Sequence, residues 1–439
     1  MTETVQLQWQ AGLKINAGDG GSQGGFPELC STPFFYTARA GDKLRLLDAQ
    51  YKFNVATYTP KIREEWIYTY CYAPDGCWAV YRNDLRGDTY RQDDYIFTES
   101  VYFRVCLRKA DRSGFDGTEN CDAIISFENT PATPTYNEDK SWLTDEIARV
   151  SAKVNALRAD GDLIFAILAD THYTVNGTWA DTACSIQGIQ ERVGLDGIIH
   201  LGDWTDGMMP QAVTRAYVNE MKADLRACGV PLWAALGNHD SNYFRGNLEP
   251  FTDGEQARLY LDRADMRYRV NLRNGICLLF LDSFDRAETL KYGYSTACAA
   301  WLERELASIP DDGQAVICSH LPPTARLQYW AKELRGEADI MRVLHRHKTK
   351  ILAYLNGHNH GDCLDNAEGF PILSIANAKC EAFLTHKTEG FVTPPRKLNT
   401  ASQGAWDIML VNKSTQTVQF LRFGAGKDRI IENGRVDWA

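Results

Sequence analysis

The sequence lacks long apolar runs, and it lacks the basic and apolar start of a secretory signal peptide. Met1 to Val5 are mostly polar, so we expect no signal peptide in this chain and a cytoplasmic location. No apolar stretch is long enough to cross a bilayer, so we expect no membrane partner. A phage-associated or surface-associated protein whose leader had been removed would show the same start.

The cysteines lack the spacing of a zinc knuckle or of a disulfide framework. Twelve are scattered between Cys30 and Cys380, no C-x-x-C occurs, and Cys71 and Cys77 are the only close pair. We therefore expect mostly reduced, buried thiols.

Basic residues are outnumbered by acidic ones, 47 to 57, so the 439 residues carry a formal net charge of -10. A surface of that sign repels phosphate backbones, which argues against general nucleic-acid binding. The length favours two domains, and a hydrophobic content of 44% is enough for sizeable cores.

Residues 1–128 have the pattern of a β-sandwich accessory domain. Phe103, Val105 and Leu107 alternate with polar residues, glycine-rich turns separate such stretches, and no helical pattern intervenes. A second period-two row is aromatic: Trp66, Tyr68, Tyr70 and Tyr72. We interpret this row as core, with a sugar-stacking face and glycan contact as the alternative.

Residues 129–141 are polar with two prolines and are expected to be a linker. In 142–439 helical and strand patterns alternate, starting with a helix whose apolar stripe runs from Leu143 to Leu157. Buried-strand patterns follow at 163–168, 198–201, 230–236, 276–281, 315–318, 351–355 and 372–375, and 407–411 with 417–421 form a closing hairpin. This alternation predicts an α/β layered domain.

Metal-binding residue types follow five of these strands. The motifs are Asp170-Thr171-His172, Gly202-Asp203-Trp204-Thr205-Asp206, Gly237-Asn238-His239-Asp240, Ser319-His320 and Gly357-His358-Asn359-His360. The carboxyl ends of strands converge on one crevice in open α/β sheets. In extended chain, D-x-H and H-x-H spacings would place both side chains on one face. Imidazole and carboxylate ligands suit Mn, Fe, Zn, Ni or Co, and the sequence does not distinguish among them.

D-x-H, G-D-x-x-D, G-N-H-D, S-H and G-H-x-H, in this order over about residues 160–425, resemble the calcineurin-like metallophosphoesterase superfamily. The resemblance implies a layered β-sandwich flanked by helices, here behind a smaller all-β sandwich. The strand Phe103-Arg104-Val105 and the tail 404–408 and 422–426 also resemble members from gut Firmicutes, which points to a bacterial chain.

The resemblance also implies roles for single residues. Asp170, His172 and His360 would hold one divalent ion, Asn238, His320 and His358 a second, and Asp203 would bridge the two. His239 would be the catalytic histidine that binds no metal, and Asp206 would orient it by accepting its ring N–H. A metal-bridging hydroxide would then attack phosphorus.

A structural explanation competes for each histidine. A lone histidine at a strand end is usually a satisfied core or surface group, and we read His200, His345, His347 and His386 in this way. Asp240 is expected to support its turn rather than a metal. For the nine motif residues taken together, the structural explanation is poor. The metal-bound tyrosine that purple acid phosphatases carry after the G-D block is replaced here by Trp204 and Thr205.

These residues predict a hydrolase of a phosphodiester or phosphomonoester, with the diester favoured by analogy. The alternative is a surface or virion-associated, glycan-binding protein that carries a secondary metallo-domain. The intact ligand set argues against that alternative.

Overall fold

The computed structural model describes residues 3–15, 22–59, 80–83, 90, 92–98, 101–129, 140–173, 178–244, 247–330, 333–380, 391–392, 394–412, 415 and 417–439. The aromatic row at 66–72 and most of the expected linker, 130–139, lie outside these ranges. The glycan-binding face and the domain limits at residues 128 and 141 therefore stay predictions.

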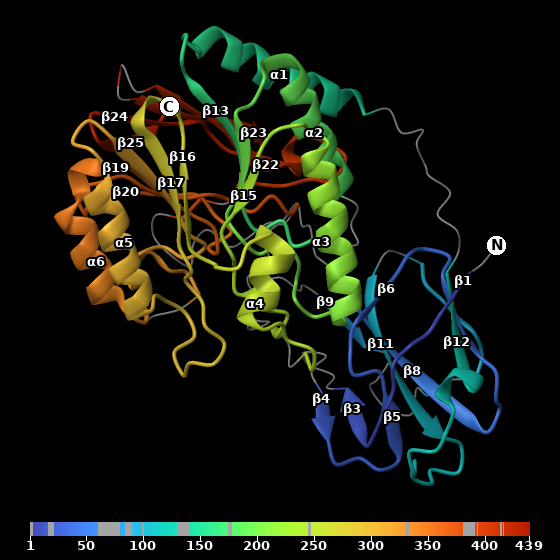
Figure 1. Cartoon of the computed structure of the whole chain (residues 1–439). Coiled ribbons are helices and arrows are strands. Elements are labelled where there is room, and N and C mark those ends of the chain that lie inside the picture. Colours follow the sequence, from blue (N-terminus) through green and yellow to red (C-terminus); the bar gives the residue numbers. More distant parts are fainter. Residues whose placement is uncertain are drawn as a thin grey trace.

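The N-terminal region is all-β, and its strand pairs are antiparallel (Figure 1). Its two main sheets enclose a core of buried side chains such as Leu44 and Phe127 from one sheet and Phe53 and Phe103 from the other. The first sheet has the order β1 (Glu3–Val5), β12 (Ile125–Asn129), β7 (Lys43–Leu46), β10 (Tyr95–Ile96). The second runs β2 (Gln10–Ala11), β5 (Leu29–Ser31), β11 (Val101–Lys109), β8 (Tyr51–Thr59), β9 (Val80–Asn83), with β6 (Tyr36–Ala38) also on β11. A small pair, β3 (Leu13–Ile15) and β4 (Ser22–Gly24), completes the region.

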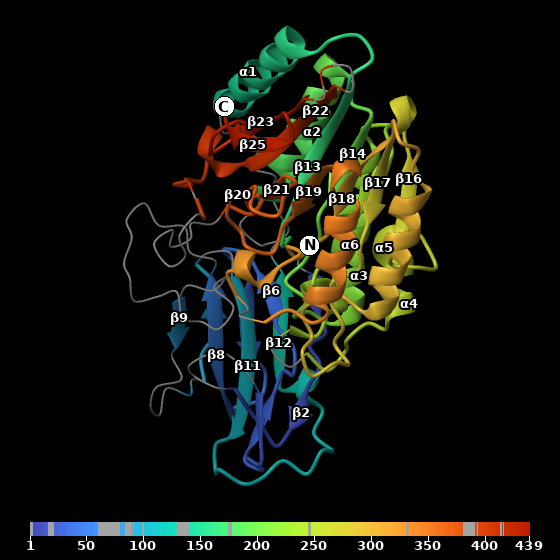
Figure 2. The same cartoon turned by 90° about the vertical axis from the view of Figure 1, so that its left-hand side faces the viewer.

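The rest of the chain is a four-layer arrangement in which two sheets face each other and helices cover their outer faces (Figure 1, Figure 2). One sheet has the order β15 (Leu232–Ala234), β14 (Gly197–His200), β13 (Leu163–Leu168), β22 (Ala405–Asn412), β23 (Thr417–Gly424), β24 (Arg429–Glu432), β25 (Arg435–Trp438). The other has the order β16 (Tyr268–Asn271), β17 (Ile276–Phe280), β18 (Gln314–Cys318), β19 (Ile351–Asn356), β21 (Ile372–Ser374), β20 (Cys363–Asp365). The helices are α1 (Ser141–Leu157), α2 (Thr178–Val193), α3 (Gln211–Arg226), α4 (Asp253–Gln256), α5 (Thr296–Ser308) and α6 (Glu337–Arg346).

Strand β13 shows why the layers form. Leu163, Phe165 and Ile167 pack between the two sheets, whereas Ile164 and Leu168 pack under the helices α1, α2 and α3. Side chains alternate between the faces of a strand, so a strand buried on both faces reads as a continuous apolar run. The second sheet repeats the pattern against α5 and α6.

The predicted fold class, α/β with a preceding all-β region, is confirmed. Two details of the prediction are wrong. Leu157, expected on the buried stripe of the first helix, is 42% exposed. The C-terminal hairpin does not close the chain, because β24 and β25 extend the sheet beyond it.

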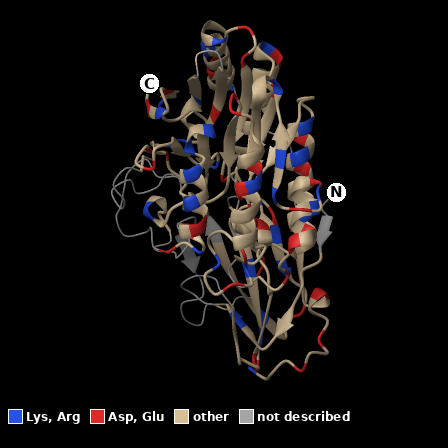
Figure 3. Cartoon of the chain, turned by 60° about the vertical axis from the view of Figure 1, so that its left-hand side comes forward, with Lys and Arg blue, Asp and Glu red and all other residues tan. Residues whose placement is uncertain are grey.

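Other expectations concern the surface and the thiols. Among the described residues, no helix combines the length and the apolar character that a bilayer span requires. The described cysteines are free, and all of them except Cys184 are buried. Basic and acidic side chains are interspersed along the helices (Figure 3).

A buried group of four charges lies at the C-terminal strands. Asp407 accepts hydrogen bonds from Arg422 (Nε to Oδ1, 2.9 Å) and from Arg429 (Nη2 to Oδ2, 2.6 Å). Arg422 also donates to Asp362 over 2.6 Å, and none of the four residues is more than 1% exposed. Asp362 follows the G-H-x-H motif, so this group joins that loop to β22 and β23.

We expect Asp407→Asn to lower the free energy of unfolding by about 3–5 kcal/mol, because it leaves two buried arginines with the single carboxylate of Asp362. Urea unfolding followed by tryptophan fluorescence measures the loss. Asp437→Asn, on the exposed side of β25, is the control and should stay within about 0.5 kcal/mol of wild type. Equal effects of the two substitutions would contradict a stabilising role for the charge group.

Candidate metal centre

The five motifs meet at one place, as the strand order requires. Asp170 follows β13, Asp203 follows β14 and Asn238 follows β15, all in one sheet, while His320 follows β18 and His358 follows β19 in the facing sheet. Because these strands run parallel within each sheet, their carboxyl ends share an edge. The candidate residues therefore gather where the edges of the two sheets face each other.

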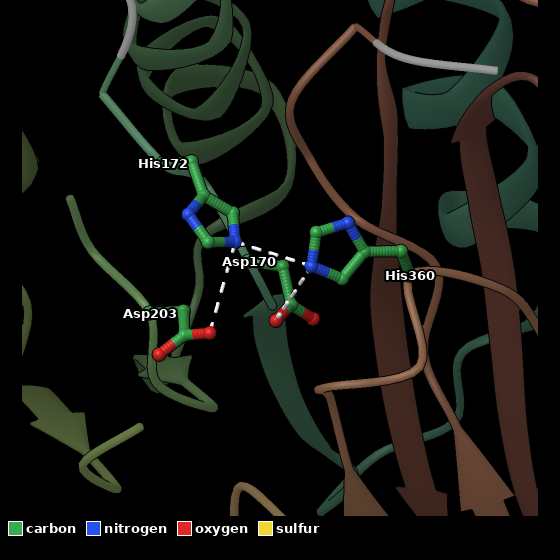
Figure 4. Close-up of side chains that lie close together, drawn as sticks. All are labelled: Asp170, His172, Asp203 and His360. Atoms are coloured by element: carbon green, nitrogen blue, oxygen red, sulfur yellow. Dashed lines mark hydrogen bonds and ion pairs between the residues drawn. The ribbon is translucent and has the colours of Figure 1, made fainter. Parts of the chain in front are cut away.

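One group of ligand atoms comes from Asp170, His172, Asp203 and His360, and all of these atoms lie within 4.8 Å of one another (Figure 4). The Nε2 atoms of His172 and His360 are 3.1 Å apart. Nε2 of His360 lies 3.6 Å from Asp170 Oδ1, and Nε2 of His172 lies 3.7 Å from Asp203 Oδ2. All four side chains are buried.

A second group of ligand atoms comes from Asp203, His320 and His358, also within 4.8 Å of one another. Asn238 Oδ1 joins them at 3.2 Å from His320 Nε2 and 3.1 Å from His358 Nδ1. Asp203 Oδ2 is 3.2 Å from His320 Nε2. Asp203 thus belongs to both groups, which is the position that a bridging ligand requires.

Two of the candidate histidines turn Nδ1 away from the ligand groups and Nε2 toward them. His320 Nδ1 is 2.9 Å from the Leu201 carbonyl oxygen, and His172 Nδ1 is 3.1 Å from Asp206 Oδ1. A proton on Nδ1 of His320 satisfies its contact with the Leu201 carbonyl oxygen, and the Nε2 atoms of both rings lie among the candidate ligands. The nitrogen and oxygen donors, buried and orientated in this way, fit borderline divalent ions.

Burial makes the centre electrostatically costly without a cation. Loss of solvent raises the pKa of Asp170 to about 6 and lowers the pKa of His172 to about 3. Burial also works to raise the pKa of Asp203, but nearby histidines, His320 above all, hold it well below its ordinary value. A divalent ion would supply the compensating charge for these carboxylates.

The backbone at the centre is unusual. Left-handed φ values occur at five candidate ligands: Asp170 (49°), His172 (38°), Asp203 (57°), His358 (66°) and His360 (56°). The expectation of extended D-x-H and H-x-H segments is therefore wrong, since left-handed turns bring the paired side chains to the centre instead. Such conformations cost about 1–3 kcal/mol each and accumulate at functional sites.

Two glycines allow the loops to approach closely. A Cβ atom on Gly237 would lie 2.1 Å from Asp203 Oδ1, and one on Gly357 would lie 2.6 Å from Asp170 Oδ2. The motif glycines at these positions are needed because the carboxylates occupy the space that a side chain would take.

His239 lies at the edge of the two groups. Its Nδ1 is 2.8 Å from the main-chain oxygen of Asp206, and its Nε2 is 4.0 Å from Asp203 Oδ2. Asp206 therefore contacts the ring through its main-chain carbonyl oxygen, and its orienting role stays a prediction. Its carboxylate faces His172 and, at 3.7 Å, Lys379 Nζ. Gly207 follows with a φ of 65°, which turns the chain directly after this carbonyl.

Two residues next to the candidate ligands, Asp240 and His200, make hydrogen bonds that support the surrounding turns and core. Asp240 accepts hydrogen bonds from the backbone N–H groups of Asp203, Trp204 and Gly237 over 2.8–2.9 Å, so it supports the turns as predicted. His200 is fully buried, with its Nε2 3.0 Å from Thr171 Oγ1, as expected of a satisfied core histidine.

Three further histidines lie away from the candidate ligands or outside the described residues, whereas one lysine lies beside the centre. His345 and His347 contact Glu368 and Glu303, and His386 lies outside the described residues. Lys379, which is 1% exposed beside Asp206, was not predicted from the sequence. It follows β21 without a recognisable motif, so only the fold reveals its place.

Residues 163–362 match the family model described as calcineurin-like phosphoesterase. The chain carries a calcineurin-like phosphoesterase domain. The matched range contains every one of the predicted site residues. The roles of the single residues within this phosphoesterase domain stay predictions.

Solved structures similar to the chain include a dimetal phosphatase from Danio rerio, with 17% identity, coverage of 62% of this chain and 98% of that chain, and a TM-score of 0.46. PhoD has 9% identity, coverage of 92% and 91%, and a TM-score of 0.42. TT1561 of Thermus thermophilus has 9% identity, coverage of 60% and 99%, and a TM-score of 0.36. No curated protein gives a significant match. These similarities are too distant to assign a substrate to the phosphoesterase domain.

We expect Gly237→Ala to displace Asp203 and to reduce bound metal by at least about 10-fold, because the new Cβ would overlap the carboxylate. Metal content per chain, measured by plasma mass spectrometry after purification and dialysis, gives the result. Gly254→Ala in α4 is the matched control, since its Cβ would meet only the flexible end of Arg258 at 3.4 Å. Full metal content in Gly237→Ala would contradict this account of the glycine.

Proposed function

We propose that this chain is a dinuclear metal-dependent phosphoesterase that hydrolyses phosphodiesters in preference to phosphomonoesters. The observation that carries the proposal is the place of Asp203, whose carboxylate belongs to both groups of buried ligand atoms. In this arrangement Asp170, His172 and His360 hold one ion, and Asn238, His320 and His358 hold the other. The chemistry that two divalent ions supply at such a centre is neutralisation of phosphate oxygens and a lowered pKa for the attacking water.

His239 is the proposed general acid. The contact between its Nδ1 and the Asp206 carbonyl oxygen, at 2.8 Å, fixes one ring nitrogen as a donor and turns the other toward Asp203. The protonated ring then donates its Nε2 proton to the leaving oxygen, which avoids release of an unstabilised alkoxide. Its place on a turn at the edge of the centre, 6% exposed, lets it meet substrate without binding a metal.

The preference for diesters rests on charge. A phosphomonoester carries nearly two negative charges near neutral pH, whereas a diester carries one. Lys379, which lies beside the centre, faces the Asp206 carboxylate at 3.7 Å, so much of its charge is already offset. A substrate with a single negative charge requires less positive charge from the centre.

We expect hydrolysis of bis-p-nitrophenyl phosphate to stop on chelation and to return with Mn, Ni, Zn or Co, at a higher kcat/KM than that of p-nitrophenyl phosphate. Asp203→Asn should lower kcat/KM by more than about 100-fold with any metal, since it weakens both ion sites at once. Asp437→Asn serves as the unaffected control. A metal-loaded wild-type chain without turnover on either ester would overturn the proposed function.

We expect His239→Gln to lower kcat by roughly 10²–10⁴-fold on diphenyl phosphate but much less on bis-p-nitrophenyl phosphate. The reason is that p-nitrophenolate is a better leaving group and needs less help from an acid. Steady-state rates on the two diesters at saturating metal give the comparison. A loss of equal size on both would assign His239 a role other than proton donation.

A further inference from the structure

The N-terminal region and the phosphoesterase domain share a hydrophobic cluster. Its buried members are Met208 and Met209 from the phosphoesterase domain and Ile15, Leu29, Phe35, Ala56 and Cys106 from the N-terminal strands and loops. Val213, Tyr217 and Phe244 pack against it from the phosphoesterase side. We call this group the shared cluster. It lies where the N-terminal region meets α3 and the loops beside it (Figure 1).

The shared cluster is close in sequence to the proposed acid. Met208 and Met209 come directly after Asp206 and Gly207, and the Asp206 carbonyl oxygen is the partner of His239 Nδ1. Both methionines are nearly inaccessible to solvent, with 3% and 4% of their surface exposed. Burial against N-terminal residues therefore holds Met208 and Met209 in place, two and three residues after Asp206, whose carbonyl oxygen contacts the His239 ring.

The loop that carries His239 is tied to the same methionine segment. The backbone N–H of Phe244 donates to Gly207 O over 3.1 Å, and the side-chain amides of Asn242 and Asn247 donate to Met209 O over 3.0 and 2.8 Å. Phe244 belongs to the shared cluster, and its ring centre is 4.2 Å from that of His239. His239 is thus held at Nδ1 and on its ring by groups that both rest on the shared cluster.

A polar contact crosses the same interface. Thr37 Oγ1, from the N-terminal region, is 3.1 Å from the hydroxyl of Tyr217 on α3. The Tyr217 ring stacks on Tyr173 with 4.4 Å between centres, and Tyr173 is the residue after His172. The N-terminal region therefore supports a second loop of the centre as well.

We propose that the N-terminal β region is a positioning element of the catalytic centre, which sets His239 through the shared cluster. Met209 is the positioning residue in this proposal. His239 sits on a short turn, and a turn has little rigidity of its own, whereas proton transfer requires placement to within a fraction of an ångström. The inference rests on the proposed function, because it assigns His239 the role of proton donor.

The test compares two methionine truncations in the full chain. Met209→Ala opens the shared cluster, and Met221→Ala opens the core beneath α3, where Met221 is fully buried. We expect Met209→Ala to lower kcat on diphenyl phosphate by about 10-fold, with a smaller loss on bis-p-nitrophenyl phosphate and little change in KM. Met221→Ala should lower Tm without a leaving-group-dependent loss, and Met209→Leu should restore the rate because it preserves volume.

Equal losses on the two diesters, or the same pattern in Met221→Ala, would overturn the inference while the proposed function stands. Wild-type protein that hydrolyses neither diester with any metal would overturn the proposed function and the inference with it. Leu29→Val, a smaller truncation on the N-terminal side of the shared cluster, covers the case in which Met209→Ala does not fold. This variant should lose less kcat than Met209→Ala, with the same dependence on the leaving group. A variant without that dependence would count against the inference.

Discussion

The concentration of carboxylates and imidazoles in a space without solvent is the constraint on which the phosphoesterase domain depends. Asp170 and Asp203 are fully or almost fully buried, and burial also lowers the pKa of the neighbouring His172 to about 3. Burial of an uncompensated carboxylate costs several kcal/mol, which no other part of a marginally stable fold readily offsets. Divalent cations would offset this cost, so we expect metal binding to stabilise the centre.

The order of the strands brings these groups together from distant parts of the chain. Two sheets pack through a core such as that of Phe165 and Phe280, and their parallel strands end along facing edges. Asp203 comes from one sheet and His320 from the other, yet Oδ2 and Nε2 are 3.2 Å apart. The left-handed turns after the strands bring the candidate ligands of the two sheets into contact. Tight packing around these turns holds the strained backbone in place.

The two parts of the chain are less independent than their different strand patterns indicate. Two independent domains would be connected by a linker alone. Here Met208 and Met209 pack with residues of the N-terminal region in a common core. Cores transmit displacements because they are densely packed, so a change in the N-terminal region can alter the geometry of a loop near Asp206. The loops of the candidate metal centre and the N-terminal region are in this way connected through packing as well as through polar groups.

The sequence by itself determined the α/β class, the strands that carry the centre and the residues that meet there. Buried strands read as apolar runs, and residues that follow parallel strands must share an edge, so 163–168 and the motif Asp170-Thr171-His172 could be placed without a structure. Only the tertiary structure decided that Asp206 contacts His239 through its carbonyl oxygen, that Lys379 lies beside Asp206 and that Met209 packs on the N-terminal strands. These depend on backbone turns and on contacts between residues far apart in the chain. The local sequence pattern does not predict these contacts, because many side chains fit the same periodicity, whereas only one packing arrangement produces these contacts.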